Sequence, residues 1–395
     1  MKKHLKSSSR FSRSKLSLFI LAFAAIGTVI YISLAAPNPN LPGDLNSDNT
    51  VNISDLSILL SNYGTSNAAA DINGDGLVNI LDLSALLSHY GSTLNVATGS
   101  LWGSTSPVNT LIPDNPQVLV NYNSGPIVGV TGIGFNSNGW GVAMFDDQAG
   151  RTRVTMTSAE GWTVDNVPLP SQLDAYVNAM AVIGDGERHM NIVDGGKVWN
   201  LYGMNKNSSG QWAPAAEGVL RVGGSGVWSN SLGPWLGRAS GFADGFGVVR
   251  KAEVDSGTVS HALTVAWPKN HITSPSIANS VVSPANTSDG SCTSNCAPMG
   301  SRIQLDPTLT DSQLISMGIS SYYLPVAHAM QKYGAYIADS SSWMTIFAES
   351  WNNNGKLPWP NGWAPITSIM THIRIVQPPP APVLDDRTIF GEPHK

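Results

Sequence analysis

The chain has 395 residues, enough for two or three domains, and charged residues make up only 12% of it, about half the usual share. Six of the 22 Lys and Arg residues stand in residues 1–15, so the rest of the chain carries 16 basic against 27 acidic residues, a net charge of −11. Such a chain has too few basic side chains to neutralise phosphates, which excludes nucleic acid as a partner.

The N-terminus predicts export. Residues 1–15 form a basic cytoplasmic flank, and residues 16–36 are an uncharged stretch of 21 residues. At ~1.5 Å per residue such a helix can span a bilayer, so its length favours an uncleaved transmembrane anchor. A cleaved signal peptide that ends at Ser33-Leu34-Ala35 is the alternative. Both place the rest of the chain outside the cell, anchored to the membrane through residues 16–36 or secreted.

Residues 43–91 carry a duplicated pattern of oxygen ligands. Segments 43–64 and 70–91 are identical at 14 of 22 aligned positions, and each sets Asp or Asn at positions 1, 3, 5, 9 and 12 of a loop. A calcium ion takes six to eight oxygens from such a 12-residue loop, so we expect two calcium ions. The predicted ligands are Asp44, Asn46, Asp48, Thr50, Asn52 and Asp55, then Asp71, Asn73, Asp75, Leu77, Asn79 and Asp82, with Thr50 and Leu77 acting through backbone carbonyls.

Each loop leads into a stretch with the apolar spacing of a helix, which Gly64 or Gly91 ends. The apolar residues are Leu56, Leu59, Leu60 and Tyr63, then Leu83, Leu86, Leu87 and Tyr90.

This duplicated loop and helix resembles a type I dockerin, in which two calcium loops each precede one helix. Asp55 and Asp82, at the position where an EF-hand has Glu, match that family. The resemblance implies EF-hand-like calcium binding, a cohesin module as partner and a place in an extracellular polysaccharide-degrading assembly. A calcium-stapled spacer that binds no cohesin is the alternative.

The remaining chain predicts a linker at 37–42 before the duplicated segment and a second linker at 92–110 after it. A large β-rich domain at 111–376 and a Pro-rich tail at 377–395 follow. Short apolar or alternating runs between Gly, Asn, Asp and Pro clusters predict a β-sandwich or barrel with a few helices. Predicted strands are 118–122, 127–135, 140–145, 153–157, 197–202, 219–222, 258–267, 302–305 and 335–338, and predicted helices are 311–317 and 322–332. The fold class is thus a mainly β domain, a small all-α calcium module and an N-terminal transmembrane or signal helix.

Two close cysteines, Cys292 and Cys296, predict a small disulfide loop in an exported chain. Zinc would need two further ligands, and none stands at the usual spacing.

Parts of the large domain resemble a family of secreted bacterial proteins of unknown reaction, which are similar to jelly-roll proteins of cell-wall or polysaccharide metabolism. The carrying segments are 185–194, 199–202, 241–250, 253, 260–263, 299–307 and 329–339. This resemblance implies a fold but no reaction. Ser260 stands where the family has Asp before a His, which weakens an Asp–His pair there.

Three functions remain open for this domain. A glycoside hydrolase needs two carboxylates, ~5–5.5 Å apart for retention or ~6.5–9.5 Å for inversion. The acidic candidates are Glu253 and Glu349, with Asp194, Asp306 and Asp339 as partners.

A polysaccharide lyase would use Arg302 to neutralise a uronate and a His or Tyr to move the proton. The catalytic candidates over both enzyme classes are His189, His261, Arg302, Asp306, Tyr333 and Glu253. Each His could instead be a core histidine, and Arg302 could instead pair with Asp306.

A non-catalytic glycan-binding, adhesion or structural surface protein is the third possibility. Its candidate sugar platforms are Trp140, Trp162, Trp199, Trp212, Trp228 and Trp235. The dockerin-like module favours the hydrolase by association, because the usual neighbours of such modules are glycan-active enzymes.

Overall fold

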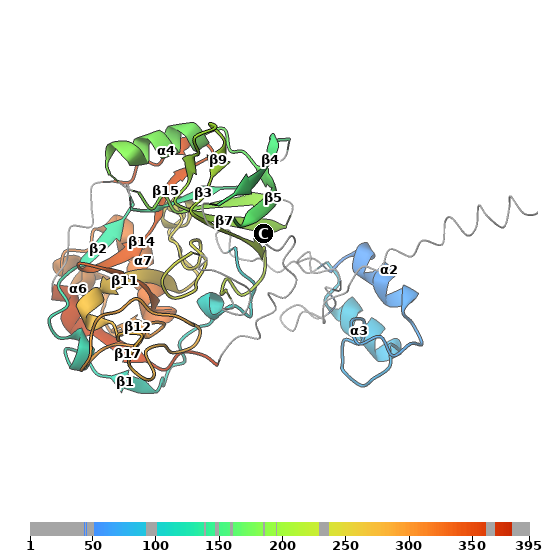
Figure 1. The fold of residues 1–395 in the computed structure, drawn as a ribbon. Helices are drawn as coiled ribbons and strands as arrows, with labels where there is room; N and C mark the ends of the chain where they lie inside the picture. Colours follow the sequence, from blue (N-terminus) through green and yellow to red (C-terminus); the bar gives the residue numbers. More distant parts are fainter. Residues whose placement is uncertain are drawn as a thin grey trace, which may run out of the picture. The chain divides into compact units, whose positions relative to one another are not determined.

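The computed structural model describes residues 43, 45, 51–91, 101–137, 140–146, 150–158, 161–184, 186–194, 196–228, 237–360 and 368–380. The backbone divides into two compact units, residues 1–95 and 96–395 (Figure 1). The predicted anchor or signal peptide at 16–36 lies outside the described residues. Among those that are described, no helix is long and apolar enough to cross a membrane.

The small unit contains two matching helices, α2 (Ile53–Ser61) and α3 (Ile80–Ser88). Each begins with the same capping box. The side chain of an Asn accepts a backbone N–H of the first helical turn, and the side chain of an Asp three residues later accepts the backbone N–H of that Asn. The two copies are tied by symmetric backbone bonds, Gly64 N–H to the Val78 carbonyl and Gly91 N–H to the Val51 carbonyl, both 2.8 Å. The sequence duplication is therefore a structural duplication.

The apolar helix positions of the small unit divide into a buried and an exposed set. The core consists of Leu45, Val51, Leu59, Ala70, Val78 and Leu86. Other large apolar side chains remain exposed, and they do so at corresponding positions: Ile53, Leu60 and Tyr63 in one copy, and Ile80, Leu87 and Tyr90 in the other. The unit thus keeps an apolar surface that its own fold does not cover.

The large unit is built on two sheets. The seven-stranded sheet has the order β1-β17-β12-β13-β11-β14-β2, and the six-stranded sheet has the order β10-β7-β6-β3-β15-β16. The first contains β1 (Val118–Val120), β2 (Ile133–Asn136), β11 (Leu263–Pro268), β12 (Arg302–Leu305), β13 (Ala335–Ser341), β14 (Met344–Phe347) and β17 (Ile373–Val376). The second contains β3 (Val142–Phe145), β6 (Met190–Asp194), β7 (Lys197–Tyr202), β10 (Ala216–Arg221), β15 (Glu349–Asn352) and β16 (Gly355–Lys356).

Two small ribbons complete the β structure. They are β4 (Arg153–Thr157) with β5 (Thr163–Pro168), and β8 (Asn205–Lys206) with β9 (Trp212–Ala213).

The chain passes directly from one sheet to the other. Strand β14 continues through Ala348 into β15, and β2 leads through a short loop to β3. A shared core of Val142, Met144, Val248, Ala266 and Phe347 fills the junction. This junction is where the candidate site lies.

The predicted β-rich domain with a few helices is confirmed, but its pairing is not that of a jelly roll. The pairs β11–β13, β14–β2, β15–β3 and β3–β6 are parallel. A jelly roll is wholly antiparallel, whereas parallel pairs need longer crossovers. Period-two patterns give strand faces but not strand direction, so the sequence could not show this difference.

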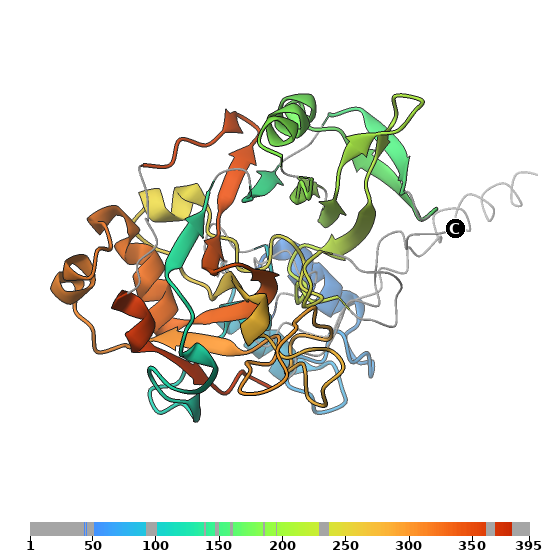
Figure 2. The same ribbon diagram turned by 60° about the vertical axis from the view of Figure 1, so that its left-hand side comes forward.

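Helices cover the outer faces of the sheets (Figures 1 and 2). Helix α4 (Leu173–Val182) packs Tyr176, Val177 and Met180 against the six-stranded sheet. Helix α7 (Leu324–Lys332) contributes Val326 and Met330 to the main core with the seven-stranded sheet. The short helices are α5 (Lys251–Asp255) and α6 (Asp311–Ser316), and the 3-10 turns are η1 (Pro107–Asn109), η2 (Gly125–Ile127), η4 (Lys269–His271), η5 (Ser321–Tyr323) and η6 (Ser368–His372).

Most predicted elements of the large unit are present. The helices predicted at 311–317 and 322–332 are confirmed as α6 and α7, with Pro325 in the first turn of α7. The strand predicted at 127–135 is wrong over its first part. There a 3-10 turn ends at Ile127, and Gly129 and Gly132 have φ of +88° and +63°, which no strand adopts. Cys292 and Cys296 are joined by a disulfide.

The predicted linker at 92–110 is too long at its C-terminal end. Residues 101–110 belong to the large unit, because Trp102 and Val108 are buried in its main core. The Trp102 indole N–H donates to the Gly245 carbonyl, 3.2 Å away.

We therefore expect Trp102→Ala to destabilise the large unit by roughly 3–5 kcal/mol, the usual cost of removing a buried aromatic side chain. Denaturant unfolding of the full chain would measure this change. Leu111→Ala is the control, because Leu111 is exposed just beyond this segment. Equal stability of the two variants would contradict the assignment of residues 101–110 to the large unit.

Candidate functional site

A cleft of about 560 Å³ opens at the junction of the two sheets, lined in part by residues of β2, β11, β13 and β14. Its lining combines aromatic, acidic and hydroxyl side chains. These residues are Gly134, Phe135, Asn136, Trp140, Glu187, Ala266, Asp289, Asp339, Ser340, Ser341, Ser342, Trp343, Thr345 and Phe347. Such a lining can stack on apolar ring faces and hydrogen-bond to hydroxyl groups.

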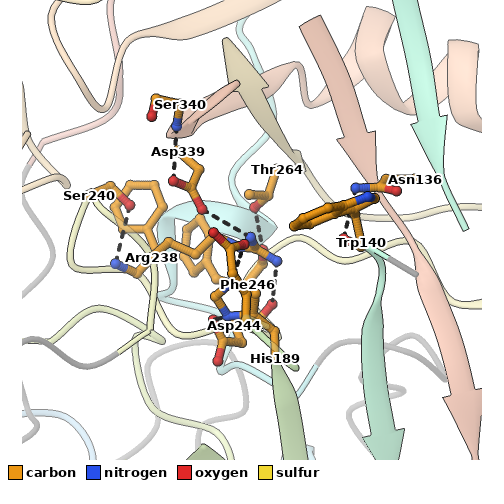
Figure 3. Close-up of polar contacts among 12 residues, drawn as sticks. Asn136, Trp140, His189, Arg238, Ser240, Asp244, Phe246, Thr264, Asp339 and Ser340 are labelled. Carbon is orange, nitrogen blue, oxygen red and sulfur yellow. Dashed lines mark hydrogen bonds and ion pairs between the residues drawn. The ribbon is translucent and has the colours of Figure 1, made fainter. Parts of the chain in front are cut away.

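Two tryptophans at the cleft are largely open to solvent. Trp140 is 48% exposed and Trp343 is 53% exposed. The Trp140 loop is closed by a 2.7 Å hydrogen bond from the Asn136 side chain to the Trp140 carbonyl (Figure 3). Exposed indoles on a concave wall are unusual, since large aromatic side chains are normally buried.

Asp339, at the C-terminal part of β13, is the first cleft carboxylate. Its Oδ2 lies 3.3 Å from the guanidinium of Arg238, a side chain with no exposed surface. The guanidinium carbon lies 3.4 Å from the ring centroid of Phe347, so the ring fixes the cation from one face. Burial raises the pKa of Asp339, and Arg238 opposes that shift only in part.

Glu187, before β6, is the second cleft carboxylate. Its side chain is half exposed, and its Oε2 lies 3.4 Å from Nε2 of His189. The other ring nitrogen, Nδ1, lies 2.7 Å from the fully buried carboxylate of Asp244 (Figure 3). His189 thus stands between two carboxylates.

The titration of these groups follows from that arrangement. Burial by itself lowers the pKa of His189, but the carboxylate of Asp244 outweighs it and raises this pKa to about 9. The hydrogen bond from His189 lowers the pKa of Glu187. The cleft therefore holds one carboxylate with a raised pKa and one with a lowered pKa, the relation that separates a general acid from a base.

A third cleft carboxylate, Asp289, lies beside these two. The Ser340 hydroxyl donates to its Oδ2 at 2.5 Å, and Lys269 lies 3.7 Å away. This bond attaches the segment around the disulfide loop to the end of β13.

Of the predicted catalytic residues, His189 contacts a cleft carboxylate, Glu187, although it does not itself line the cleft. His261 and Glu253 form a separate buried pair, 3.1 Å apart. Glu253 also accepts the backbone N–H of Arg250 and so caps helix α5. These two side chains fill structural roles that a local sequence pattern cannot distinguish from catalytic ones.

Arg302, Tyr333 and Asp306 form no common site with His189. Arg302 is buried, and its guanidinium donates to the backbone carbonyls of Tyr333 and Thr110. Among the described residues, Arg302 and Asp306 form no ion pair. Asp306 instead accepts hydrogen bonds from the backbone N–H and the hydroxyl of Thr308 in a turn. Arg302 thus satisfies two carbonyls inside the core and does not face the cleft.

The other acidic and aromatic candidates also separate. Glu349 is buried against Arg250, and Asp194 pairs with Arg153, so only Asp339 of this set lines the cleft. Trp199 and Trp228 are core residues, Trp162 and Trp212 are half-buried, and Trp235 lies outside the described residues. Trp140 is the predicted platform that reaches the cleft.

Sequence analysis missed Glu187, Arg238, Asp244 and Trp343. Trp343 could have been found, because a Trp that follows three serines at the end of a predicted strand is expected to be exposed. The other three are charged residues in a chain with few charges, but nothing local links positions 187, 238 and 244 to one another.

The predicted calcium loops are only partly described. Asp44, Asn46, Asp48 and Thr50 of the first loop lie outside the described residues, whereas the second loop is complete. Asp71 accepts the backbone N–H groups of Gly74, Asp75 and Gly76, so its carboxylate faces into the loop.

The side chain of Asn79 contacts two other residues of the second loop. The Asn79 amide nitrogen lies 3.2 Å from an Asp75 carboxylate oxygen and 2.9 Å from the Leu77 carbonyl oxygen. The described ranges contain no cluster of three His, Cys, Asp or Glu side chains that could hold a metal. The loop also offers Asn side-chain and backbone carbonyl oxygens, which are hard ligands of the kind that calcium prefers.

The position-12 residues are equivalent in the two copies. Asp82 accepts backbone N–H bonds from Ile72, Asn73 and Asn79, and Asp55 accepts them from Leu45 and Asn52. Each Asp thereby closes its loop onto the start of its helix, and the residues of the second loop fit a calcium loop.

Comparison with known proteins identifies the small unit. The family model for the dockerin type I domain matches residues 42–89. A solved structure described as a type II cohesin-dockerin domain from Bacteroides cellolosolvens is 38% identical, covers 14% of this chain and 93% of its own, and has a TM-score of 0.14. No curated protein matches the chain.

The pair His189–Asp244 predicts a pH-dependent stability. The folded pKa of about 9 lies above the ordinary value of 6.5, so the contribution is complete below pH 6.5 and is lost as pH rises through 9. The free energy of unfolding of the large unit should fall by on the order of 3 kcal/mol between these limits. Denaturant titrations across this range measure the effect. A wild-type profile identical to that of Asp244→Asn would contradict the pairing.

Proposed function

Residues 42–89 are a type I dockerin module, and from this premise we propose that the protein is an extracellular component that docks on a cohesin and hydrolyses a polysaccharide. The uncharged stretch 16–36 is the segment that we propose directs export, as an anchor or as a signal peptide. The dockerin supports the location and the assembly, whereas the cleft of the large unit supports the chemistry.

The exposed apolar residues of the small unit support the docking role. Ile53, Leu60 and Tyr63 recur as Ile80, Leu87 and Tyr90, and all six are exposed. Water-exposed apolar groups of this kind in a small module are typical of a protein-binding surface. We propose that a cohesin covers them.

Calcium binding is part of this proposal. The twelve predicted loop residues would hold two ions, one in each loop, and the ions would fix loops that begin the helices. Helices α2 and α3 have nine residues each, and isolated helices of this length are marginal in water. Ligand binding would therefore supply part of the folding energy of the module.

The observation that carries the hydrolase proposal is the pair of carboxylates, Asp339 and Glu187, whose pKa values are shifted in opposite directions in one aromatic cleft. A protonated Asp339 would donate its proton to the glycosidic oxygen as the bond to the leaving sugar breaks. The ionised Glu187 would attack the anomeric carbon, or would take a proton from the water that does. In the first route water then hydrolyses the bond between Glu187 and the sugar, and in the second route water attacks directly, so one water molecule is consumed for each bond cleaved.

The charge of the cleft supports an uncharged glycan. Three carboxylates and no Lys, Arg or His are among the described residues that line it. A polyuronate would meet these carboxylates at close range, which costs free energy. The lyase alternative needs a cation to neutralise a uronate, and Arg302 is engaged with backbone carbonyls instead.

A glycan-binding role without turnover is the second candidate. The exposure of Trp140 and Trp343 on the cleft favours it, because both indoles can stack on sugar rings without any catalytic group.

Chelation tests the calcium proposal. We expect isothermal titration of the calcium-free full chain to give two bound ions, and Asp82→Ala to give one. Removal of calcium should also reduce helical circular dichroism. Asp311→Ala, an exposed acidic change outside the loops, is the control and should keep two ions. An unchanged stoichiometry in Asp82→Ala would contradict the predicted ligand set.

Product release tests the hydrolase proposal. With a panel of neutral polysaccharides, Asp339→Asn and Glu187→Gln should each lower the rate of reducing-sugar release by about 10²–10⁴-fold, the usual contribution of a general acid or base. The pH profile should be bell-shaped, because activity needs Glu187 ionised and Asp339 protonated. Asp194→Asn is the control, since this carboxylate pairs with Arg153 outside the cleft.

Three outcomes separate the alternatives. Full activity in both cleft variants would contradict the hydrolase. Unsaturated products that absorb in the ultraviolet would identify a lyase. Retention on glycan without turnover, lost in Trp343→Ala, would identify a binding protein.

A further inference from the structure

A single turn, Gly237–Asp244, contacts one cleft carboxylate directly, Asp339, and the other, Glu187, through His189. The turn is closed by backbone bonds from Arg238 N–H to the Phe242 carbonyl, 2.9 Å, and from Gly241 N–H to the Arg238 carbonyl, 2.8 Å. Gly237 has φ of +83°, and a Cβ there would lie 2.3 Å from the Phe242 carbonyl oxygen. The backbone of the turn therefore has little freedom.

The two ends of the turn carry opposite charges that reach different carboxylates. Arg238 reaches Asp339 directly at 3.3 Å. Asp244 reaches His189 at 2.7 Å, and His189 reaches Glu187 at 3.4 Å. The backbone N–H of Asp244 donates to the Asn200 side chain at 2.6 Å, which fixes that end to β7.

We infer that the Gly237–Asp244 turn is the positioning element of the cleft, holding Asp339 through Arg238 and Glu187 through Asp244 and His189. The inference rests on the proposed function for its catalytic meaning, since it assigns Arg238, Asp244 and His189 as positioning residues for the two carboxylates. None of the three lines the cleft, so each acts through another group.

The two cleft carboxylates share charged groups that shift their pKa values. Glu187 interacts with His189 and Arg238. Asp339 interacts with Arg238, His189 and Glu187, and with the backbone N–H of Ser340. Every cation in these two sets is either on the turn or bonded to it. Removal of one end of the turn should therefore change one carboxylate more than the other.

Removal of the negative end has a defined consequence. Without the Asp244 carboxylate, burial opposes the charged form of His189 and only Glu187 favours it, so the pKa of His189 should fall from about 9 toward its ordinary value of 6.5. Neutral His189 no longer stabilises the charged form of Glu187, whose pKa should then rise. Asp339 keeps Arg238 and should change less.

Carboxyl and imidazole titration by NMR of the full chain tests this inference without any substrate. In the wild type, the Glu187 carboxyl signal should shift a second time near pH 9, when His189 loses its proton. In Asp244→Asn, that second step should move down by at least two pH units together with the His189 titration. Asp289→Asn is the matched control, because it removes a cleft carboxylate that is bonded to Ser340 and not to the turn.

A Glu187 signal that shows no step when His189 titrates would overturn the inference, and the wild type alone decides this if Asp244→Asn does not fold. A Glu187 titration equally displaced by Asp289→Asn would overturn it as well. Coupled titrations in a protein that cleaves no glycan would reject the proposed function but not the positioning role. Glycan cleavage with uncoupled titrations would reject the positioning role alone.

Discussion

The ion pair between His189 and Asp244 is the interaction on which the cleft depends. Asp244 is fully buried and lies 2.7 Å from the His189 ring, and an unpaired charge at that depth would cost several kcal/mol. The pair joins the start of β6 to the turn that carries Arg238. One side of it holds Glu187 at the cleft, and the other end of the turn holds Asp339. The buried pair of His189 and Asp244 thus holds the two cleft carboxylates, Glu187 and Asp339, in place.

The two helices of the small unit and its dockerin pattern could be predicted because their determinants are local. Asn52 with Asp55, and Asn79 with Asp82, close their capping boxes within three residues. Because the segment is duplicated, the same pattern appears twice in the sequence, which strengthens the prediction. What the pattern could not show is that Leu60 and Tyr63 stay exposed, because helical spacing marks an apolar face but not what covers it.

The cleft could not be predicted for the opposite reason. Its lining residues come from 134–136, 140, 187, 266, 289 and 339–347, which lie far apart in the sequence. Parallel pairings such as β14 with β2 connect segments some 200 residues apart, and strand periodicity does not encode them. Glu253 and Arg302 were reasonable candidates by residue type, yet the fold uses one to cap a helix and the other to satisfy backbone carbonyls.

In the proposed function, the dockerin module holds the protein in an assembly and the large unit acts on a glycan. The central claim is that a sugar chain occupies the cleft between Trp140 and Trp343. A crystal structure of the Asp339→Asn variant with a bound neutral oligosaccharide tests it most directly. The account predicts a sugar ring stacked on Trp343 or Trp140, with the glycosidic oxygen at hydrogen-bond distance from residue 339. An oligosaccharide bound elsewhere on the large unit, with the cleft holding only solvent, would contradict it.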